Sequence, residues 1–193
     1  MPEAKTSYTT ILGAAAEHYV MCQLLRRSLI AALAPAGVPF ADILVSNHLG
    51  SALSAVQVKA RTVGADGGWH MSSKHEKLDQ AFYLYCFVDF GPDLNNQPRC
   101  WIVPSGIVAK VLIKSYQAWL HKPGKGGKPH KDHDMRRLRP DYSDLDLQGY
   151  GPDWLKSYKD AWHLVAASAP ATVGKVTDQD AMLVPGTVQS ESG

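Results

Sequence analysis

One short run, from Ala81 to Phe90 (AFYLYCFVDF), constrains the fold more than any other part of the chain. Its residues are almost all apolar or aromatic, and many of them favour strands. A strand with apolar residues at both odd and even positions is buried on both of its faces. The sequence therefore predicts a sheet with a packing layer on each side.

The segments around this strand predict those layers. Apolar residues recur at three- and four-residue spacing from Ser7 to about Ala34, which predicts one long helix closed by Pro35 and Gly37. We expect strands over 40–45, 52–60 and 99–103, and a second long helix over 105–120. A Gly-rich loop over 63–68 and a short helix opened by a Ser73–Glu76 capping box complete the core. The expected class is α/β, with a small mixed central sheet flanked by helices.

The rest of the chain divides into three parts. Residues 121–140 are rich in Gly, Pro and charge and predict an exposed basic loop. Residues 154–167 predict a closing amphipathic helix with Trp154, Tyr158 and Trp162 on one side. We expect 1–167 to form a single domain and 168–193 to form a flexible tail.

Composition narrows the class of protein. The 45% hydrophobic content is enough to bury a core, and a formal net charge of +2 means that any affinity for polyanions depends on where the charges lie. Cys22, Cys86 and Cys100 are isolated, which predicts reduced core thiols rather than disulfides. With no expected secretory signal or membrane span, the predicted location is the cytoplasm.

Three polar residues stand out in the two strands predicted over 40–45 and 52–60. Side chains alternate between the faces of a strand, so Gln57 and Lys59 point to the same side. Antiparallel pairing with the preceding strand would bring Asp42 close to Gln57. Burying such groups is costly unless they are partnered, and Mg²⁺ would explain them through a carboxylate, an amide oxygen and the backbone carbonyl of Val58.

These residues resemble the PD-(D/E)XK nuclease superfamily, whose motif is an acid at the start of one strand and acid-x-Lys on the next. Here the motif reads Ala41-Asp42 and Gln57-Val58-Lys59, preceded by Gly13-Ala-Ala-Ala-Glu17 as a G-x-x-x-E signature. The chain looks most like the Gln-x-Lys variants among homing-endonuclease and Holliday-junction-resolvase-like proteins. The resemblance covers roughly residues 8 to 115. Ala41 replaces the usual Pro, and Gln57 removes one negative charge from the motif.

The resemblance implies a restriction-endonuclease-like core of αβββαβ type and a metal-dependent endonuclease that hydrolyses DNA phosphodiester bonds. It implies a catalytic set of Glu17, Asp42, Gln57 and Lys59, with Lys59 orienting or deprotonating the attacking water. The implied metal ligands are Glu17, Asp42, Gln57 and Val58, and the implied cofactor is Mg²⁺, for which Mn²⁺ is a substitute. Because cutting both strands of a duplex normally needs two sites, we also expect a homodimer, with the closing helix as one candidate seam.

Basic residues outside the motif predict the DNA contacts. Flexible Lys and Arg side chains can neutralise phosphates without reading the base sequence. The candidates follow the two motif strands or lie in the basic loop, and they are Lys74, His75, Lys125, Lys128, Lys131, Arg136 and Arg137.

Two other functions remain open at this point. Gln57 is also the substitution expected in a catalytically silent nuclease fold that serves as a DNA-binding or protein-interaction module. A third reading is an enzyme that acts on small phosphorylated substrates, which would not need the basic loop. Taken singly, Asp42, Lys59 and Glu17 are each also compatible with an ordinary surface position.

Overall fold

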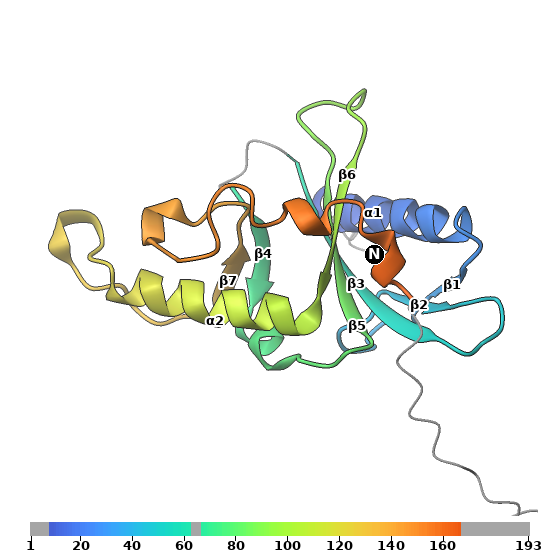
Figure 1. Ribbon diagram of the computed structural model, residues 1–193. Coiled ribbons are helices and arrows are strands. Elements are labelled where there is room, and N and C mark those ends of the chain that lie inside the picture. The colour runs from blue at the N-terminus through green and yellow to red at the C-terminus, as the bar shows by residue number, and fades with distance from the viewer. Residues whose placement is uncertain (1–7, 63–66, 167–193) are drawn as a thin grey trace, which may run out of the picture.

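The computed structural model describes residues 8–62 and 67–166 of the chain. A five-stranded mixed sheet in the order β1-β2-β3-β5-β6 forms its centre (Figure 1). The pairs are antiparallel except β3 with β5, which run parallel. The strands are β1 (Ile30–Leu33), β2 (Ile43–Ser46), β3 (Leu53–Arg61), β5 (Tyr83–Asp89) and β6 (Arg99–Pro104).

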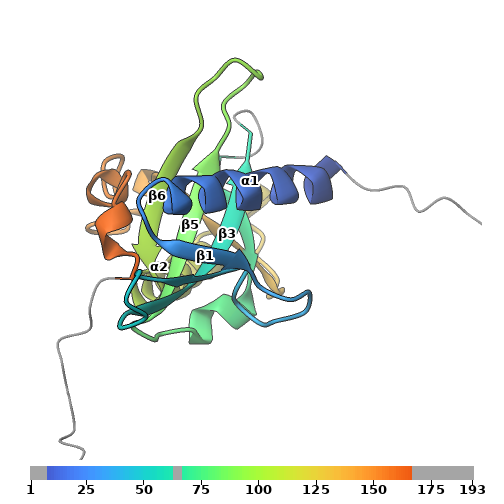
Figure 2. The same cartoon turned by 90° about the vertical axis from the view of Figure 1, so that its right-hand side faces the viewer.

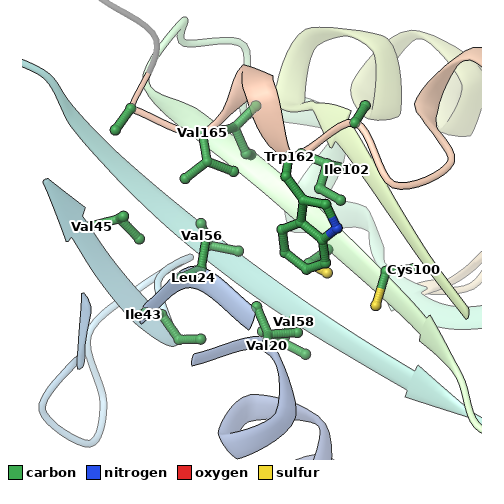
Figure 3. Close-up of a cluster of buried hydrophobic side chains, with 14 of the residues drawn as sticks. Val20, Leu24, Ile43, Val45, Val56, Val58, Cys100, Ile102, Trp162 and Val165 are labelled. Atoms are coloured by element: carbon green, nitrogen blue, oxygen red, sulfur yellow. The ribbon is translucent and has the colours of Figure 1, made fainter. Parts of the chain in front are cut away.

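Two long helices lie on opposite faces of this sheet (Figure 2). Helix α1 (Tyr8–Leu25) packs on one face together with Cys86 and Val88, and Figure 3 shows part of this core, from Val20 on the helix to Val56 on β3. Helix α2 (Ser105–His121) packs on the other face with Tyr85 and Phe87. The predicted burial of this strand on both faces and the α/β class are therefore confirmed.

The parallel pairing of β3 with β5 fits the expected αβββαβ order, but the crossover between them differs from expectation. Parallel neighbours need a crossover, which is usually an α-helix. Here the crossover contains a short strand, β4 (Trp69–Ser72), and a 3-10 helix, η1 (Ser73–Lys77). Strand β4 pairs with β7 (Met135–Leu138) in a small antiparallel sheet. The predicted loop 63–68 falls partly on residues 63–66, outside the described residues.

The first predicted helix was too long. Helix α1 ends at Leu25, Ser28 takes a left-handed conformation with φ of 60°, and 30–33 continue as the edge strand β1. Alanine and leucine suit either structure at the sheet edge, and pairing with β2 outweighs the helical spacing. Of the predicted core thiols, Cys86 and Cys100 are buried but Cys22 is exposed, and all three are free.

The capping box does not form. Ser73 Oγ instead donates a hydrogen bond to Asp134, and Glu76 makes an ion pair with Arg136. Both partners come from the predicted loop 121–140, which therefore contains an ordered strand as well as a short 3-10 turn, η2 (Lys125–Gly127). A further turn, η3 (Ser143–Leu145), follows.

The described part of 154–167 forms no α-helix but two 3-10 turns, η4 (Lys156–Tyr158) and η5 (Trp162–Leu164). The chain passes the outer edge of β6 here, since Asp160 N donates to Cys100 O at 3.0 Å. Trp154 and Tyr158 pack in the core below α2, whereas Trp162 packs in the core below α1. The three side chains are thus divided between two cores and do not share one side of a helix, while the dimer seam expected above stays a prediction.

No helix in the described ranges has both the length and the apolar character needed to cross a bilayer. The predicted tail, 168–193, lies outside the described residues.

Candidate active site

The candidate site lies where β3 continues past the start of β2. Asp42 precedes β2, and its backbone N–H donates to Val56 O at 2.9 Å, the last backbone bond between these two segments. Beyond this bond, the Asp42 side chain rather than a backbone group pairs with β3. Its Oδ2 accepts a hydrogen bond from Val58 N at 2.7 Å and a second one from the Gln57 amide.

Val58 contributes its backbone rather than its side chain. The side chain is buried in the core below α1. Backbone groups of a strand point alternately to its two neighbours, so Val58 directs its N–H and C=O to the same side as Val56 does. The Val58 carbonyl therefore lies at the open edge beside Asp42, where an oxygen ligand was expected.

Gln57 and Lys59 occupy the face of β3 that is turned away from α1. Their parallel register places them beside Tyr85 and Phe87 of β5. Gln57 is buried and Lys59 is half-buried. Burial lowers the pKa of Lys59, Asp42 and Glu17 oppose that shift, and the ammonium of Lys74 adds to it. Lys59 is thus held in a mixed field of both signs.

Glu17 reaches the same region from α1. Its half-buried position raises the pKa of its carboxyl group, and the nearby Asp42 carboxylate raises it further, while His18 and Lys59 act in the opposite direction. Glu17, Asp42 and Lys59 are therefore within electrostatic reach of one another. The Asp42 carboxylate disfavours the charged form of Glu17, and a bound cation would relieve that cost.

The donor set fits Mg²⁺ by ligand type. Mg²⁺ prefers oxygen ligands and keeps several waters, and this edge offers the carboxylates of Glu17 and Asp42, the Gln57 amide and the Val58 carbonyl. Within residues 8–62 and 67–166, no group of three or more His, Cys, Asp or Glu side chains is arranged for a metal. With only two acids, the set should bind a divalent cation more weakly than three carboxylates would.

His75 is buried next to the site, where it contacts Tyr85 and Phe40. Its ring is 2% exposed, its Nδ1 lies 2.7 Å from the Tyr85 hydroxyl, and its edge meets the Phe40 ring with centroids 5.7 Å apart. Burial, with smaller contributions from Lys59 and Lys74, lowers the pKa of His75 to about 4. The ring is therefore neutral at pH 7 and presents almost no surface to DNA. The adjacent Lys74 is exposed.

The predicted DNA contacts in the basic loop also include both buried and exposed side chains. Arg136 is buried, is paired with Glu76 and lies over the Tyr116 ring at 3.3 Å, so its guanidinium serves the packing of the loop. Lys128 and Lys131 are exposed, Arg137 on β7 is half-buried, and Lys125 belongs to η2.

Aromatic contacts hold this loop against α2. Trp119 stacks on His130 with ring centroids 3.9 Å apart. Tyr116 donates to Asp132 at 2.6 Å and accepts from His133 N at 2.7 Å. The loop is thus more ordered than its composition suggested.

Sequence reasoning missed the aromatic support of the site. Tyr85 lies beside Gln57 in register, and Phe40 takes a left-handed φ of 60° two residues before Asp42. Gln57 and Lys59 point to the same face of the sheet, and the parallel register with β5 places Tyr85 on that face as well. Without that register, nothing in the sequence groups Tyr85 with them. Phe40 carried no signal in the sequence.

No protein-family model matches the chain, and no curated protein is significantly similar in sequence. Among solved structures, that of a bacterial homing endonuclease is similar to it, with a TM-score of 0.46 and 14% identity over 82% of this chain and 91% of that chain. A likeness at this level assigns no role to any residue here.

Proposed function

We propose that the protein is a metal-dependent endonuclease that hydrolyses phosphodiester bonds in DNA. The observation that carries the proposal is the open edge of β3, where the Asp42 carboxylate binds the Val58 N–H and the Gln57 amide beside Lys59. Glu17 adds a second carboxylate from α1. A buried sheet position would otherwise be a costly place for this group of charges.

The residues divide the chemistry among themselves. Glu17, Asp42, Gln57 and the Val58 carbonyl would hold Mg²⁺, or Mn²⁺ in its place, which supplies positive charge opposite the phosphate oxygens. Lys59 orients the attacking water. Because burial and Lys74 lower its pKa, the amine is neutral more often and can accept the proton of that water. The exposed ammonium of Lys74 can then contact the phosphate.

In the same proposal, cations outside this edge also hold the DNA. Lys74, Lys128, Lys131 and Arg137 are the contacts that we retain, whereas the side chain of Lys125 lies outside what the structure describes. Cleavage of both strands would need a second active site, so the homodimer remains part of the proposal. The cytoplasmic location also remains a prediction.

The test is cleavage of supercoiled plasmid and of a branched DNA with Mg²⁺ or Mn²⁺. Asp42→Asn and Lys59→Met should each lower the rate by about 10² to 10⁴-fold, the range for loss of a positioned acid or base. Asp153→Asn and Lys110→Met remove the same charges at exposed positions and should cut like the wild type. Cleavage that survives chelation, or that is unchanged in Asp42→Asn and Lys59→Met, would contradict the proposal.

A specific observation favours a silent DNA-binding module as the second candidate. Asp42 Oδ2 already accepts two hydrogen bonds, from Val58 N and from Gln57, so part of its capacity for a cation is used within the protein. In that case wild-type protein binds duplex DNA with the same affinity with and without Mg²⁺, and it cuts no substrate.

A further inference from the structure

A second polar site lies away from the residues described so far. A concave pocket of about 390 Å³ opens between the C-terminal end of α1, the start of β6 and the segment that follows η4. Figure 2 shows the end of α1 beside β6 and this closing segment. Its volume corresponds to roughly a dozen water molecules. Its lining residues are Tyr19, Gln23, Arg26, Arg27, Gln97, Pro98, Arg99, Lys159, Asp160 and Trp162.

The charge of this pocket is concentrated and of one sign. Four cationic side chains, Arg26, Arg27, Arg99 and Lys159, face one carboxylate, Asp160. The whole chain carries a formal net charge of only +2, and these five residues carry +3, so the remainder of the protein carries a net charge of −1. Like charges kept together in a concavity attract an anion.

Two of the arginines are held in place by contacts that leave the pocket positive. Arg27 donates to the backbone O and the side-chain Oε1 of Gln23, both at 2.8 Å, and lies 4.7 Å from the centroid of the Trp162 ring. These partners are neutral. Arg99 is fixed by Asp89 at 3.0 Å, but Arg61 binds the same carboxylate oxygen at 2.9 Å. One buried acid thus serves two arginines.

Three of the four cations have no acid of their own. Among the described residues, no ion pair joins Arg26, Arg27 or Lys159 to a carboxylate, and all three side chains are exposed. A merely solvated surface would separate such charges or pair them with acids. Here the fold brings them together from distant parts of the sequence.

We propose that this pocket is a phosphate-binding site, with Arg26, Arg27, Arg99 and Lys159 as its cations and the Gln23 and Gln97 amides as neutral donors. Guanidinium groups fixed before binding lose little freedom when they bind a phosphate through paired N–H donors. Strand β5 separates β6 from β3, so the phosphate held here is not the one at the candidate active site. The inference does not depend on the proposed nuclease activity.

Two sources of phosphate share this chemistry: a small oligophosphate or nucleotide, and the backbone of a nucleic acid. Calorimetric titration with inorganic pyrophosphate in magnesium-free buffer tests the first. Fluorescence anisotropy with a labelled duplex at several salt concentrations tests the second. Neither measurement requires catalysis, so failure of the nuclease proposal in the cleavage assay leaves both results meaningful.

The variants are expected to change the affinity for the probes in opposite directions. Arg26→Gln combined with Lys159→Gln should weaken binding at least tenfold, and Asp160→Asn should tighten it several-fold. If the source is DNA, the double variant should also lower the slope of log K against log salt by about 0.9 for each phosphate that the variant no longer neutralises. Lys110→Gln combined with Lys114→Gln removes two exposed charges from α2 and is the matched control.

Binding of either probe that falls in the Arg26 and Lys159 double variant but not in the α2 control supports the site and identifies its source. The proposal is overturned if each probe binds the Arg26 and Lys159 double variant as it binds the α2 control. This holds whether a probe binds both variants equally or binds neither of them. Thermal melting of each variant shows that the comparison is made between folded proteins.

Discussion

Among single residues, Gln57 would limit how strongly the proposed metal site holds a cation. Its amide donates to Asp42, and both groups lie at the open edge of β3. A carboxylate at this position would add negative charge for a cation but would repel Asp42 when no cation is bound. In the proposed site, a substitution at Gln57 would therefore change both the metal affinity and the stability of the metal-free protein.

The prediction for Gln57→Glu follows from that balance. The variant should melt below the wild type in chelator and should gain more melting temperature from added Mg²⁺, since only the folded form provides the site. Gln148→Glu, at an exposed position, adds the same charge elsewhere and serves as the control. An equal Mg²⁺ response in wild type and Gln57→Glu would place the cation, if any, at other residues.

His75 makes a pH-dependent contribution that can be separated from catalysis. Its pKa is about 4 in the folded protein, against roughly 6.5 in an unfolded chain. Between these values the unfolded state binds more protons, so the free energy of unfolding falls as the pH drops from 6.5 to 4, by on the order of 2 to 3 kcal/mol. Urea titrations across this range should show the loss in wild type and a flatter dependence in His75→Gln. Identical pH profiles would contradict the assignment.

At the scale of elements, the end of α1 shows how a helix gives way to a strand. Ser28 takes a left-handed φ of 60° between the helix and β1, and its side chain is exposed. A residue with a Cβ atom pays a conformational cost there, and glycine does not. Substitutions at Ser28 therefore report on the backbone conformation of this turn.

Ser28→Gly should raise the free energy of unfolding by up to about 1 kcal/mol, while Ser28→Val should lower it, because a branched side chain tolerates positive φ poorly. Denaturant titration of the two variants gives the comparison. If the helix instead continued to residue 34, Ser28→Gly would lower the free energy of unfolding, since glycine is the poorer helix former.

At the scale of the whole molecule, the segment from Trp154 to Ala166 joins the two cores. Trp154 packs below α2, Trp162 packs below α1, and Ala166 N donates to Ser54 Oγ of β3 at 2.8 Å. Figure 3 shows the Trp162 ring among side chains of the sheet such as Ile102 and Cys100. The segment thus closes the β6 edge without forming a helix.

Trp162→Ala should lower the free energy of unfolding by about 3 to 5 kcal/mol, as expected for removing a large buried side chain. His163→Ala changes the neighbouring exposed residue and should have little effect. Comparable losses in both variants would mean that the segment, and not the Trp162 ring, carries the stabilisation.

Features that depend on local pattern could be predicted from the order of residues alone. The apolar run that contains β5 required layers on both sides, and the alternation of a strand placed Gln57 and Lys59 on one face. The hairpin of β2 and β3 brought Asp42 to Gln57, because antiparallel register follows from two neighbouring strands and a short turn.

Features that depend on partners far along the chain could be seen only in the folded protein. Residues 30–33 became a strand because β2 pairs with them, and 135–138 became a strand because β4 does. Glu76 does not form the predicted capping box, because it pairs with Arg136, which lies 60 residues away. The cationic pocket likewise combines residues from α1, β6 and the closing segment. Such contacts exist only after the chain has folded, since local propensities are weaker than the burial and pairing that a distant segment provides.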